Sequence, residues 1–243
     1  MADRAKAMLS MHLGNADKTV GSGRLGALRG TNPRGESYGF TGYYMTRNGK
    51  PWIPVVGEFH YSRFSCLQWE EELLKMKAGG VDIVATYVFW NHHEEEEGVF
   101  DWSGDRNLRY FVDLCEKVGF PLIVRIGPFC HGEVRNGGIP DWVFAKPVEI
   151  RSNDEGYLAL ARRLYAEIAR QLRGKFFTEG GPVIAVQLEN EYMHAGAPND
   201  AWGYERKFLT SGKDGRAHLD ELRRIARECG IRPVFFTATA LVG

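Results

Sequence analysis

The chain has 243 residues, of which 44% are hydrophobic, so it can bury a core large enough for one sizeable α/β domain. Its 31 basic and 31 acidic residues cancel, which removes the electrostatic reason to expect a nucleic acid or an anionic membrane as the main partner. We therefore expect an uncharged partner, and the aromatic content of 12% suits either sugar faces or ordinary core packing.

The N-terminal residues and the cysteines bear on organisation and location. Residues 1–36 are rich in Gly, Lys and Arg without sustained periodicity, which predicts a mobile leader before a folded part at 37–243. The leader lacks the apolar stretch of a secretory signal, so we expect a cytoplasmic protein unless its true start lies elsewhere. The cysteines are scattered without a C-x-x-C pair, which argues against a zinc knuckle or a disulfide framework and fits a reducing compartment: Cys66, Cys115, Cys130 and Cys229.

Residues 51–61 start an alternation of strand-like and helix-like segments. A helix follows, opened by Ser65 and Gln68 with the spacing of a capping box and ended by a glycine pair. Residues 81–90 are the next β-rich segment, and apolar residues at helical spacing over 108–118 predict the second helix.

The same alternation continues along the rest of the chain. We expect a third strand at 121–129, a long loop, and then a helix over 157–172. A fourth strand at 182–191 and a helix over 219–229 follow, and a fifth strand begins at residue 233.

Near-continuous apolar strands separated by amphipathic helices are typical of a parallel sheet covered by helices. The chain has no G-x-G-x-x-G or G-x-x-x-x-G-K-[ST] turn, which argues against a nucleotide-binding fold of this class. The predicted fold is therefore a (β/α)8 TIM barrel that stops after about its fifth strand. In such barrels the active site forms at the C-terminal ends of the strands.

Polar side chains follow the predicted strands, and we expect them to converge on one rim of the barrel. They are Glu58 and His60 after the first strand, Tyr87, Asn91, His92, His93 and Glu94 after the second, His131 and Glu133 after the third, and Asn190 and Glu191 after the fourth. A carboxyl group delivered to a pocket with apolar walls has a raised pKa and can act as a general acid.

The end of the fourth strand raises a geometric question. Simple alternation sends Glu189 and Glu191 to one face and Asn190 to the other. If Asn190 and Glu191 both serve the site, the strand must therefore twist or bulge at its end. On the strand pattern alone, Glu191 could instead be a surface carboxylate that caps the next helix.

Beyond these patterns, four stretches of the chain are similar, in order, to the motifs of glycoside hydrolase family 35, the β-galactosidases. They are GEFHYSRF (57–64), TYVFWNHHEEEEGVFDWSG (86–104), RIGPFCHGEVRNGGIPDW (125–142) and GGPVIAVQLENEY (180–192). This resemblance implies a retaining glycosidase that removes terminal β-linked galactose from a carbohydrate and needs no metal or organic cofactor.

The resemblance also implies roles for individual residues. Glu191, in N-E-Y, corresponds to the general acid/base, and Asn190 before it corresponds to the residue that binds the sugar 2-hydroxyl. Tyr87 and Asn91 belong to the T-Y-x-x-W-N-x-H-E motif and are implied to contact the substrate. Glu133 corresponds to a glutamate that holds galactose hydroxyls.

Three features depart from the family pattern. Where its members commonly read R-P-G-P-Y-I-C-A-E, this chain has RIGPFCHGE, so we expect different sugar contacts from Cys130 to Gly132. Met193 replaces the usual glycine after N-E-Y, which predicts a different aglycone preference. A retaining glycosidase also needs a second carboxyl about 5–5.5 Å from the first, the nucleophile. In this family it follows the seventh strand, so no residue here matches it, and we expect an N-terminal part of the domain that is inactive alone.

Two other functions remain open on the sequence. A metal-dependent barrel hydrolase could use histidines near the strand ends, namely His60, His92, His93 and His131. A non-catalytic carbohydrate-binding module would fit a missing nucleophile. The acidic run from Glu94 to Glu97 is interpreted as a solvated loop rather than a cation site.

Overall fold

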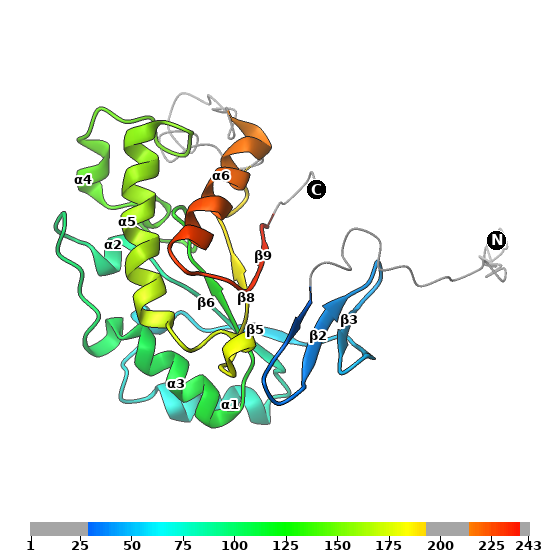
Figure 1. Cartoon of the computed structure of the whole chain (residues 1–243). Helices are drawn as coiled ribbons and strands as arrows, with labels where there is room; N and C mark the ends of the chain where they lie inside the picture. The colour runs from blue at the N-terminus through cyan, green and yellow to red at the C-terminus, as the bar shows by residue number, and fades with distance from the viewer. Residues whose placement is uncertain (1–28, 193–213, 239–243) are drawn as a thin grey trace, which may run out of the picture.

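The computed structural model describes residues 29–192 and 214–238, which form two sheets and the helices that cover one of them (Figure 1). The antiparallel sheet contains β1 (Gly30–Thr31), β2 (Ser37–Phe40), β3 (Met45–Arg47) and β4 (Lys50–Trp52). The parallel sheet contains β5 (Val56–Glu58), β6 (Ile83–Tyr87), β7 (Leu122–Arg125), β8 (Val183–Gln187) and β9 (Val234–Phe236). The α-helices are α1 (Trp69–Ala78), α2 (Trp90–His93), α3 (Leu108–Val118), α4 (Asp141–Phe144), α5 (Glu155–Leu172) and α6 (Gly215–Glu228). Short 3-10 helices lie at Tyr61–Arg63, Gly104–Arg106, Arg135–Gly138 and Phe177–Glu179.

The parallel sheet has the order and direction that the alternating segments predict. Each strand from β5 to β8 pairs in parallel with the next strand along the chain, which ends this sheet at β9 within the described residues. Helices α1, α3, α5 and α6 lie on one side of this sheet (Figure 1). Because all five strands run the same way, their C-terminal ends meet at one edge, where the polar residues were expected.

Two of the predicted helices have capping groups that explain their bounds. The side chain of Asn107 accepts a hydrogen bond from Tyr110 N at the start of α3, and Gly119 ends that helix with φ 83°. Asp154 accepts from Tyr157 N at the start of α5. The predicted capping box at the first helix is wrong. Helix α1 begins only at Trp69, and residue 68, its N-cap, makes no side-chain capping bond.

The segment predicted as one strand at 51–61 is divided between the two sheets. Its first residues belong to β4 and its middle residues to β5. Pro54 lies between them, and proline has no N–H to donate to a strand ladder. The sequence analysis therefore missed the antiparallel sheet, whose strands are two to four residues long.

The antiparallel sheet packs across the N-terminal ends of the parallel strands. Tyr38 of β2 lies with its ring centroid 4.8 Å from that of Phe177 and joins a buried cluster with Ile83 and Ile184, near the starts of β6 and β8. Of the expected leader at 1–36, residues 1–28 lie outside the described residues, and Gly30–Thr31 form β1. Regular structure is thus already present at Gly30.

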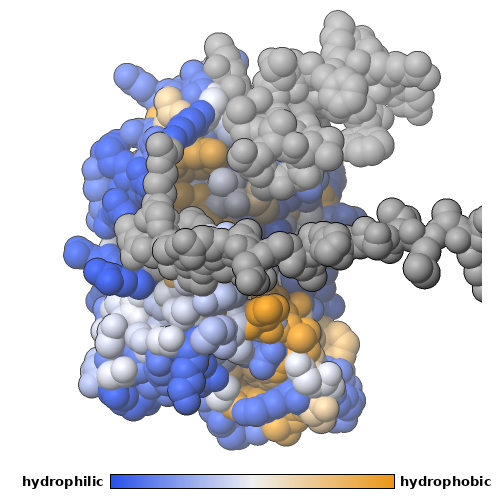
Figure 2. All heavy atoms as spheres, turned by 90° about the vertical axis from the view of Figure 1, so that its right-hand side faces the viewer, coloured by the Kyte–Doolittle hydropathy of each residue, from blue (hydrophilic) through white to orange (hydrophobic). Residues whose placement is uncertain are grey.

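The main core lies between the parallel sheet and its helices. Val84, Val124 and Val186 of successive strands belong to one buried cluster with apolar residues of α1, α3, α5 and α6. The edge strands are less covered, since Val56 of β5 is 47% exposed and Phe236 of β9 is 36% exposed. Figure 2 shows apolar side chains at the surface in two areas of the side that faces right in Figure 1. Within the described residues, no helix is long and apolar enough to cross a membrane.

Candidate active site

The backbone changes direction twice just after β8. Strand β8 ends at Gln187, and then Glu189 and Glu191 adopt left-handed conformations with φ 55° and 49°. Such a conformation costs a residue other than glycine on the order of 1 kcal/mol, so the surroundings must impose it. Glu189 N donates to Gly127 O at 2.9 Å and Glu191 N donates to Ala238 O at 2.8 Å, which ties this segment to the chain after β7 and after β9.

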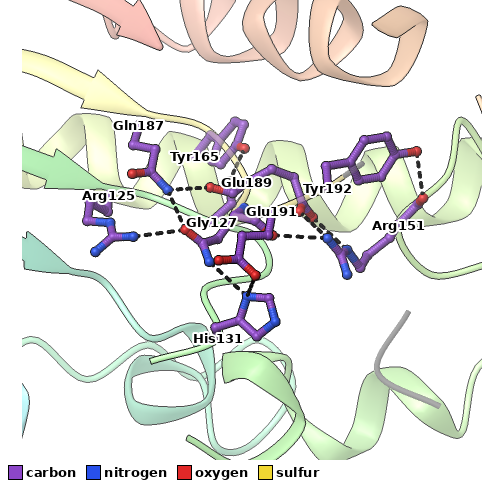
Figure 3. A network of polar contacts seen from close by, with 10 residues as sticks. Arg125, Gly127, His131, Arg151, Tyr165, Gln187, Glu189, Glu191 and Tyr192 are labelled. Atoms are coloured by element: carbon purple, nitrogen blue, oxygen red, sulfur yellow. Dashed lines mark hydrogen bonds and ion pairs between the residues drawn. The ribbon is translucent and has the colours of Figure 1, made fainter. Parts of the chain in front are cut away.

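This irregular backbone supplies the twist that simple alternation required. Asn190 Nδ2 lies 2.8 Å from His131 Nδ1, and Glu191 Oε2 lies 3.9 Å from the same nitrogen (Figure 3). The amide and the carboxyl therefore both approach one imidazole, although they are adjacent in the sequence. His131 itself follows β7 and is also left-handed, with φ 55°.

The orientation of the Asn190 amide follows from its neighbours. Its Oδ1 accepts hydrogen bonds from Arg125 Nη2 at 2.8 Å and from Gln187 Nε2 at 3.0 Å. Both neighbours can only donate through these nitrogens, so the oxygen of the amide must face them. The NH2 group of Asn190 then faces His131, whose Nδ1 accepts and must be unprotonated in this arrangement.

Arg125 connects the ends of the four strands from β5 to β8. Besides Asn190, its guanidinium binds the carboxylate of Glu58 at the end of β5. It also lies 3.7 Å from the ring centroid of Tyr87, the last residue of β6. Burial raises the pKa of the Tyr87 hydroxyl, which therefore stays protonated at neutral pH. The structure thus brings two predicted site residues, Tyr87 and Asn190, to one arginine.

The two glutamates of the E-N-E segment have contrasting environments. The Glu191 side chain is 35% exposed, whereas that of Glu189 is fully buried and accepts two hydrogen bonds from Arg151, at 2.6 and 3.1 Å. Burial raises the pKa of the Glu189 carboxyl, and the Arg151 guanidinium opposes that increase. The carboxyl enclosed by the protein is therefore that of Glu189, and the accessible one is that of Glu191.

Arg151 contacts residues on both sides of Glu191. It precedes α5, and its Nη2 also donates to Asn190 O at 3.2 Å. Its own carbonyl accepts from Tyr192 Oη at 3.0 Å, and its guanidinium lies 3.9 Å from the centroid of the Phe129 ring. One buried arginine thus contacts Glu189 and Asn190 before the partly exposed Glu191, and Tyr192 after it.

The other predicted substrate contacts lie further along the rim. Asn91 in α2 donates from Nδ2 to Arg135 O at 3.3 Å, while its Oδ1 is buried without a hydrogen-bond partner in the described residues. Glu133 is exposed in a left-handed conformation with φ 46°. Burial lowers the pKa of His60, and the carboxylates of Glu58 and Glu133 oppose that shift, which puts these groups within electrostatic reach of one another.

The acidic run after α2 is only partly a solvated loop. Residues 95–97 are exposed, but Glu94 is fully buried. Its carboxylate accepts from Trp90 Nε1 at 2.6 Å and from Gly98 N at 2.7 Å, and it pairs with Arg163 of α5. Glu94 therefore stabilises the loop rather than facing solvent.

The histidines near the strand ends mostly form hydrogen bonds with neighbouring side chains. Tyr61 Oη lies 2.6 Å from His93 Nε2, and Ser62 Oγ lies 2.9 Å from His92 Nδ1. Across residues 29–192 and 214–238, no three His, Cys, Asp or Glu side chains come together as a metal site requires. The metal-dependent alternative therefore gains no support from this geometry.

Sequence reasoning missed three organising residues: Arg125, Arg151 and Gln187. The position of Arg125 offered a signal, because a charged residue ends the otherwise apolar run of β7. Gln187 offered a weaker one at the end of β8. Arg151 lies in the connection before α5, where no pattern distinguishes it from a solvated surface arginine.

Comparison with protein families and curated proteins gives a consistent result. The model for glycosyl hydrolases family 35 matches residues 44–221. A beta-galactosidase from Canis lupus familiaris is 34% identical over 174 residues, which cover 71% of this chain and 26% of the relative. A beta-galactosidase from Xanthomonas manihotis is 38% identical over 157 residues, or 64% of this chain and 26% of the relative. The chain spans about a quarter of the length of these curated relatives.

Solved structures support the fold class. A GH5_18 protein from Streptomyces cattleya in complex with GlcNAc matches with a TM-score of 0.59 at 12% identity, over 76% of this chain and 44% of that one. An exo-beta-1,4-mannosidase from an Opitutaceae bacterium matches with a TM-score of 0.56 at 15% identity, over 85% and 33% of the two chains. Sequence identities this low show a similarity of fold only. The described part is a partial TIM barrel, and the predicted fold class is confirmed.

Proposed function

The chain belongs to glycosyl hydrolase family 35, and on that basis we propose that it carries the acid/base side of a site that releases terminal β-linked galactose. The observation that carries this proposal is the arrangement of the two residues after Glu189. An accessible carboxyl, Glu191, lies beside an amide whose NH2 group is turned outward by Arg125 and Gln187. A partly exposed carboxyl beside a fixed hydrogen-bond donor suits protonation of a glycosidic oxygen on a sugar held by its hydroxyls.

In the proposed reaction, Glu191 gives its proton to the departing glycosidic oxygen. A carboxylate attacks the anomeric carbon to form a covalent galactosyl intermediate, and Glu191 then deprotonates the water that releases galactose with retained configuration. Two neighbouring glutamates are poorly placed to attack, because Glu189 is bound by Arg151 and Glu58 by Arg125. We therefore propose that the nucleophile comes from a part of the barrel outside the 243 residues of this chain, which spans about a quarter of its curated relatives, and we expect no turnover by the chain alone.

Asn190 is proposed to hold the sugar 2-hydroxyl. Its Oδ1 is already occupied by two donors, so the amide can only donate to the hydroxyl oxygen through Nδ2. In the described structure His131 Nδ1 takes that bond. A sugar 2-hydroxyl that replaces the imidazole would therefore find a donor whose orientation is fixed in advance, which limits the entropy lost on binding.

The remaining contacts are proposed from their place on the same rim. Tyr87 adds an apolar ring and a protonated hydroxyl beside Arg125. Asn91 has a buried oxygen without a partner in the described residues, and Glu133 is exposed near His60. A neutral β-galactoside fits a set of groups that act by hydrogen bonding, and the proposed chemistry requires neither a metal nor an organic cofactor.

Replacing Glu191 by alanine tests the central role in a form of the enzyme that includes the nucleophile. Proton donation matters most for a poor leaving group such as another sugar and least for a stabilised phenolate. Glu191→Ala should therefore lower kcat/KM far more on lactose than on an activated aryl β-galactoside. Azide needs no deprotonation, so it should restore turnover on the aryl substrate and yield β-galactosyl azide.

The same assay separates this role from general damage. Glu95→Ala, in the exposed acidic loop, should leave kcat/KM on both substrates unchanged. Equal loss on both substrates, with no azide rescue or with the α-azide as product, would show that Glu191 is not the acid/base. Turnover by the unaltered 243-residue chain would place the nucleophile within it, contrary to the proposal.

A further inference from the structure

A cavity of about 230 Å³ lies at the opposite end of the parallel strands from Glu191. It is bounded by residues at the starts of β1, β8 and β9, by the 3-10 helix at Phe177–Glu179 and by the C-terminal part of α6. Four arginines line it, and none of its lining residues is acidic: Arg29, Arg223, Arg227 and Arg232. The chain thus concentrates positive charge here, although its overall charge is zero.

The arginines of this cavity differ from their neighbours in how their charge is balanced. Arg223 pairs with Asp220 at 2.7 Å. The guanidinium groups of Arg29, Arg227 and Arg232 form no ion pair or hydrogen bond within the described residues, and that of Arg227 instead lies 5.7 Å from the centroid of the Phe235 ring. By contrast, Arg224 on the same helix binds both Glu221 and Glu228. The carboxylates of α6 therefore balance the arginine outside the cavity and leave most of the charge inside it uncompensated.

A helix terminus alone does not account for this group. Arg227 is in the last turn of α6, where a cation is favoured by the helix dipole. Arg29 and Arg232, however, come from the segment before β1 and from the connection between α6 and β9. These arginines are exposed, so water and salt screen much of their mutual repulsion. A hollow lined by guanidinium groups from three segments, with no carboxylate among its lining residues, still has a positive potential that favours an anion.

We propose that this cavity binds the phosphate or sulfate group of a small molecule. Guanidinium groups offer paired N–H donors that match the oxygens of such groups, with strong charge-assisted hydrogen bonds. The rest of the wall is largely apolar and includes Phe177, Ile184 and Phe235, which suits a small organic body attached to the anion. The volume is below that of a drug-sized site, so the ligand is on the scale of a phosphorylated or sulfated monosaccharide.

Binding at this site would connect the two sheets. Its walls come from β1 of the antiparallel sheet and from β8 and β9 of the parallel sheet. A ligand that binds only the native arrangement stabilises it in proportion to the logarithm of ligand concentration over Kd. The oxyanion should therefore raise the Tm of the chain, independently of any galactoside at the opposite end of the strands.

The test is direct titration of the 243-residue chain with inorganic phosphate, inorganic sulfate, galactose 6-phosphate and galactose 6-sulfate, by calorimetry and by thermal unfolding at constant ionic strength. At least one of these should bind saturably and raise Tm, whereas chloride should not. In Arg227→Ala/Arg232→Ala the Kd should rise by about tenfold or more, since two charged hydrogen-bonding groups are lost. Arg224→Ala, on the same helix but outside the cavity, should keep the original Kd.

The titrations with different probes also distinguish between ligands and include results that would overturn the proposal. Tighter binding of a sugar ester than of its inorganic ion assigns the apolar wall to the organic body, and a difference between phosphate and sulfate identifies the group. No saturable binding by any of the four probes overturns the proposal. An equal loss of affinity in Arg224→Ala, or an equal change in Tm with chloride, would show that general charge screening causes the effect. Either result would also overturn the proposal. None of these results depends on galactosidase activity.

Discussion

The residues after β8 show how one short segment separates a structural carboxyl from an accessible one. Glu189 and Glu191 should share a face of an extended strand, but both are left-handed, so Glu189 turns to buried Arg151 while Glu191 stays near the partly exposed imidazole of His131. The motif was enough to locate Asn190 and Glu191, and alternation was enough to demand a twist. The left-handed backbone itself could not be predicted, because glutamate is not a residue that marks positive φ.

Asn190→Ala tests the residue scale in the enzyme form that includes the nucleophile. The hydrogen bond from Asn190 to the sugar 2-hydroxyl should strengthen as positive charge develops on the ring in the transition state. We expect kcat to fall by about 10²-fold or more, as on removal of other donors that act in the transition state. Steady-state kinetics on an aryl β-galactoside would measure this. An unchanged kcat with only a raised KM would assign Asn190 to uniform substrate binding instead.

Elements that are long and strongly periodic were predictable here, and short ones were not. Helices α3 and α5 follow directly from apolar spacing, and the structure adds Asn107 and Asp154 as the residues that cap them. The antiparallel sheet escaped prediction because strands of two to four residues show too little alternation to recognise. The Ser65 capping box failed because the chain first makes a turn, with Gln68 N donating to Ser65 O. Ser65, which was expected to cap a helix, thus takes part in a turn before the helix instead.

The contact between the start of α5 and the end of β8 depends on an ion pair that is almost entirely inaccessible. The side chains of Arg151 and Glu189 are 2% and 0% exposed, so removal of one partner leaves a buried charge without compensation. We expect Arg151→Met to lower the free energy of unfolding by about 3–5 kcal/mol. Urea denaturation of the 243-residue chain would measure it.

Two comparison variants make that measurement specific. Arg151→Met/Glu189→Leu removes both charges and should recover much of the stability, because apolar replacement of a whole buried pair is often neutral. Arg162→Met breaks an exposed pair with Glu228 and should cost no more than about 1 kcal/mol. A loss in Arg151→Met no larger than that in Arg162→Met would contradict the role assigned to the buried pair.

At the scale of the whole molecule, the described residues form one side of a barrel, and the candidate site residues lie along one edge of its parallel sheet. The sequence predicted the order of the parallel strands and the edge that carries the site. It could not predict that Arg125 would bind Glu58, Tyr87 and Asn190 together, since these residues are brought close only by the strand register. The rim therefore depends on the complete sheet being folded, and conditions that unfold the sheet should abolish the site cooperatively.

Two buried histidines make the stability of the whole fold depend on pH. His93 and His218 are 1% and 0% exposed, and burial lowers the pKa of each to about 4 from 6.5. Both rings stay neutral in the folded chain while they take up protons in the unfolded chain below pH 6.5. Their stabilising contribution is therefore complete above pH 6.5 and is lost as pH falls toward 4, by about 3 kcal/mol for each ring. The raised pKa of Glu189 acts in the opposite direction, so the raw pH profile does not isolate them.

Comparison of variants does isolate them. In wild type, the free energy of unfolding from urea titrations should fall between pH 6.5 and 4.5. In His218→Gln the free energy of unfolding should depend less steeply on pH over this range. The difference in slope should be close to that contributed by one bound proton, because the unfolded state no longer takes up a proton at that position. His218→Gln should still be less stable at pH 7, since the imidazole packs with its centroid 4.8 Å from that of Tyr192 and its Nδ1 lies 3.0 Å from Asn153 Oδ1. His92→Gln is the matched control, because His92 is only half-buried, and it should change the slope less. An unchanged slope in His218→Gln would mean that His218 titrates alike in both states and is not held neutral by burial.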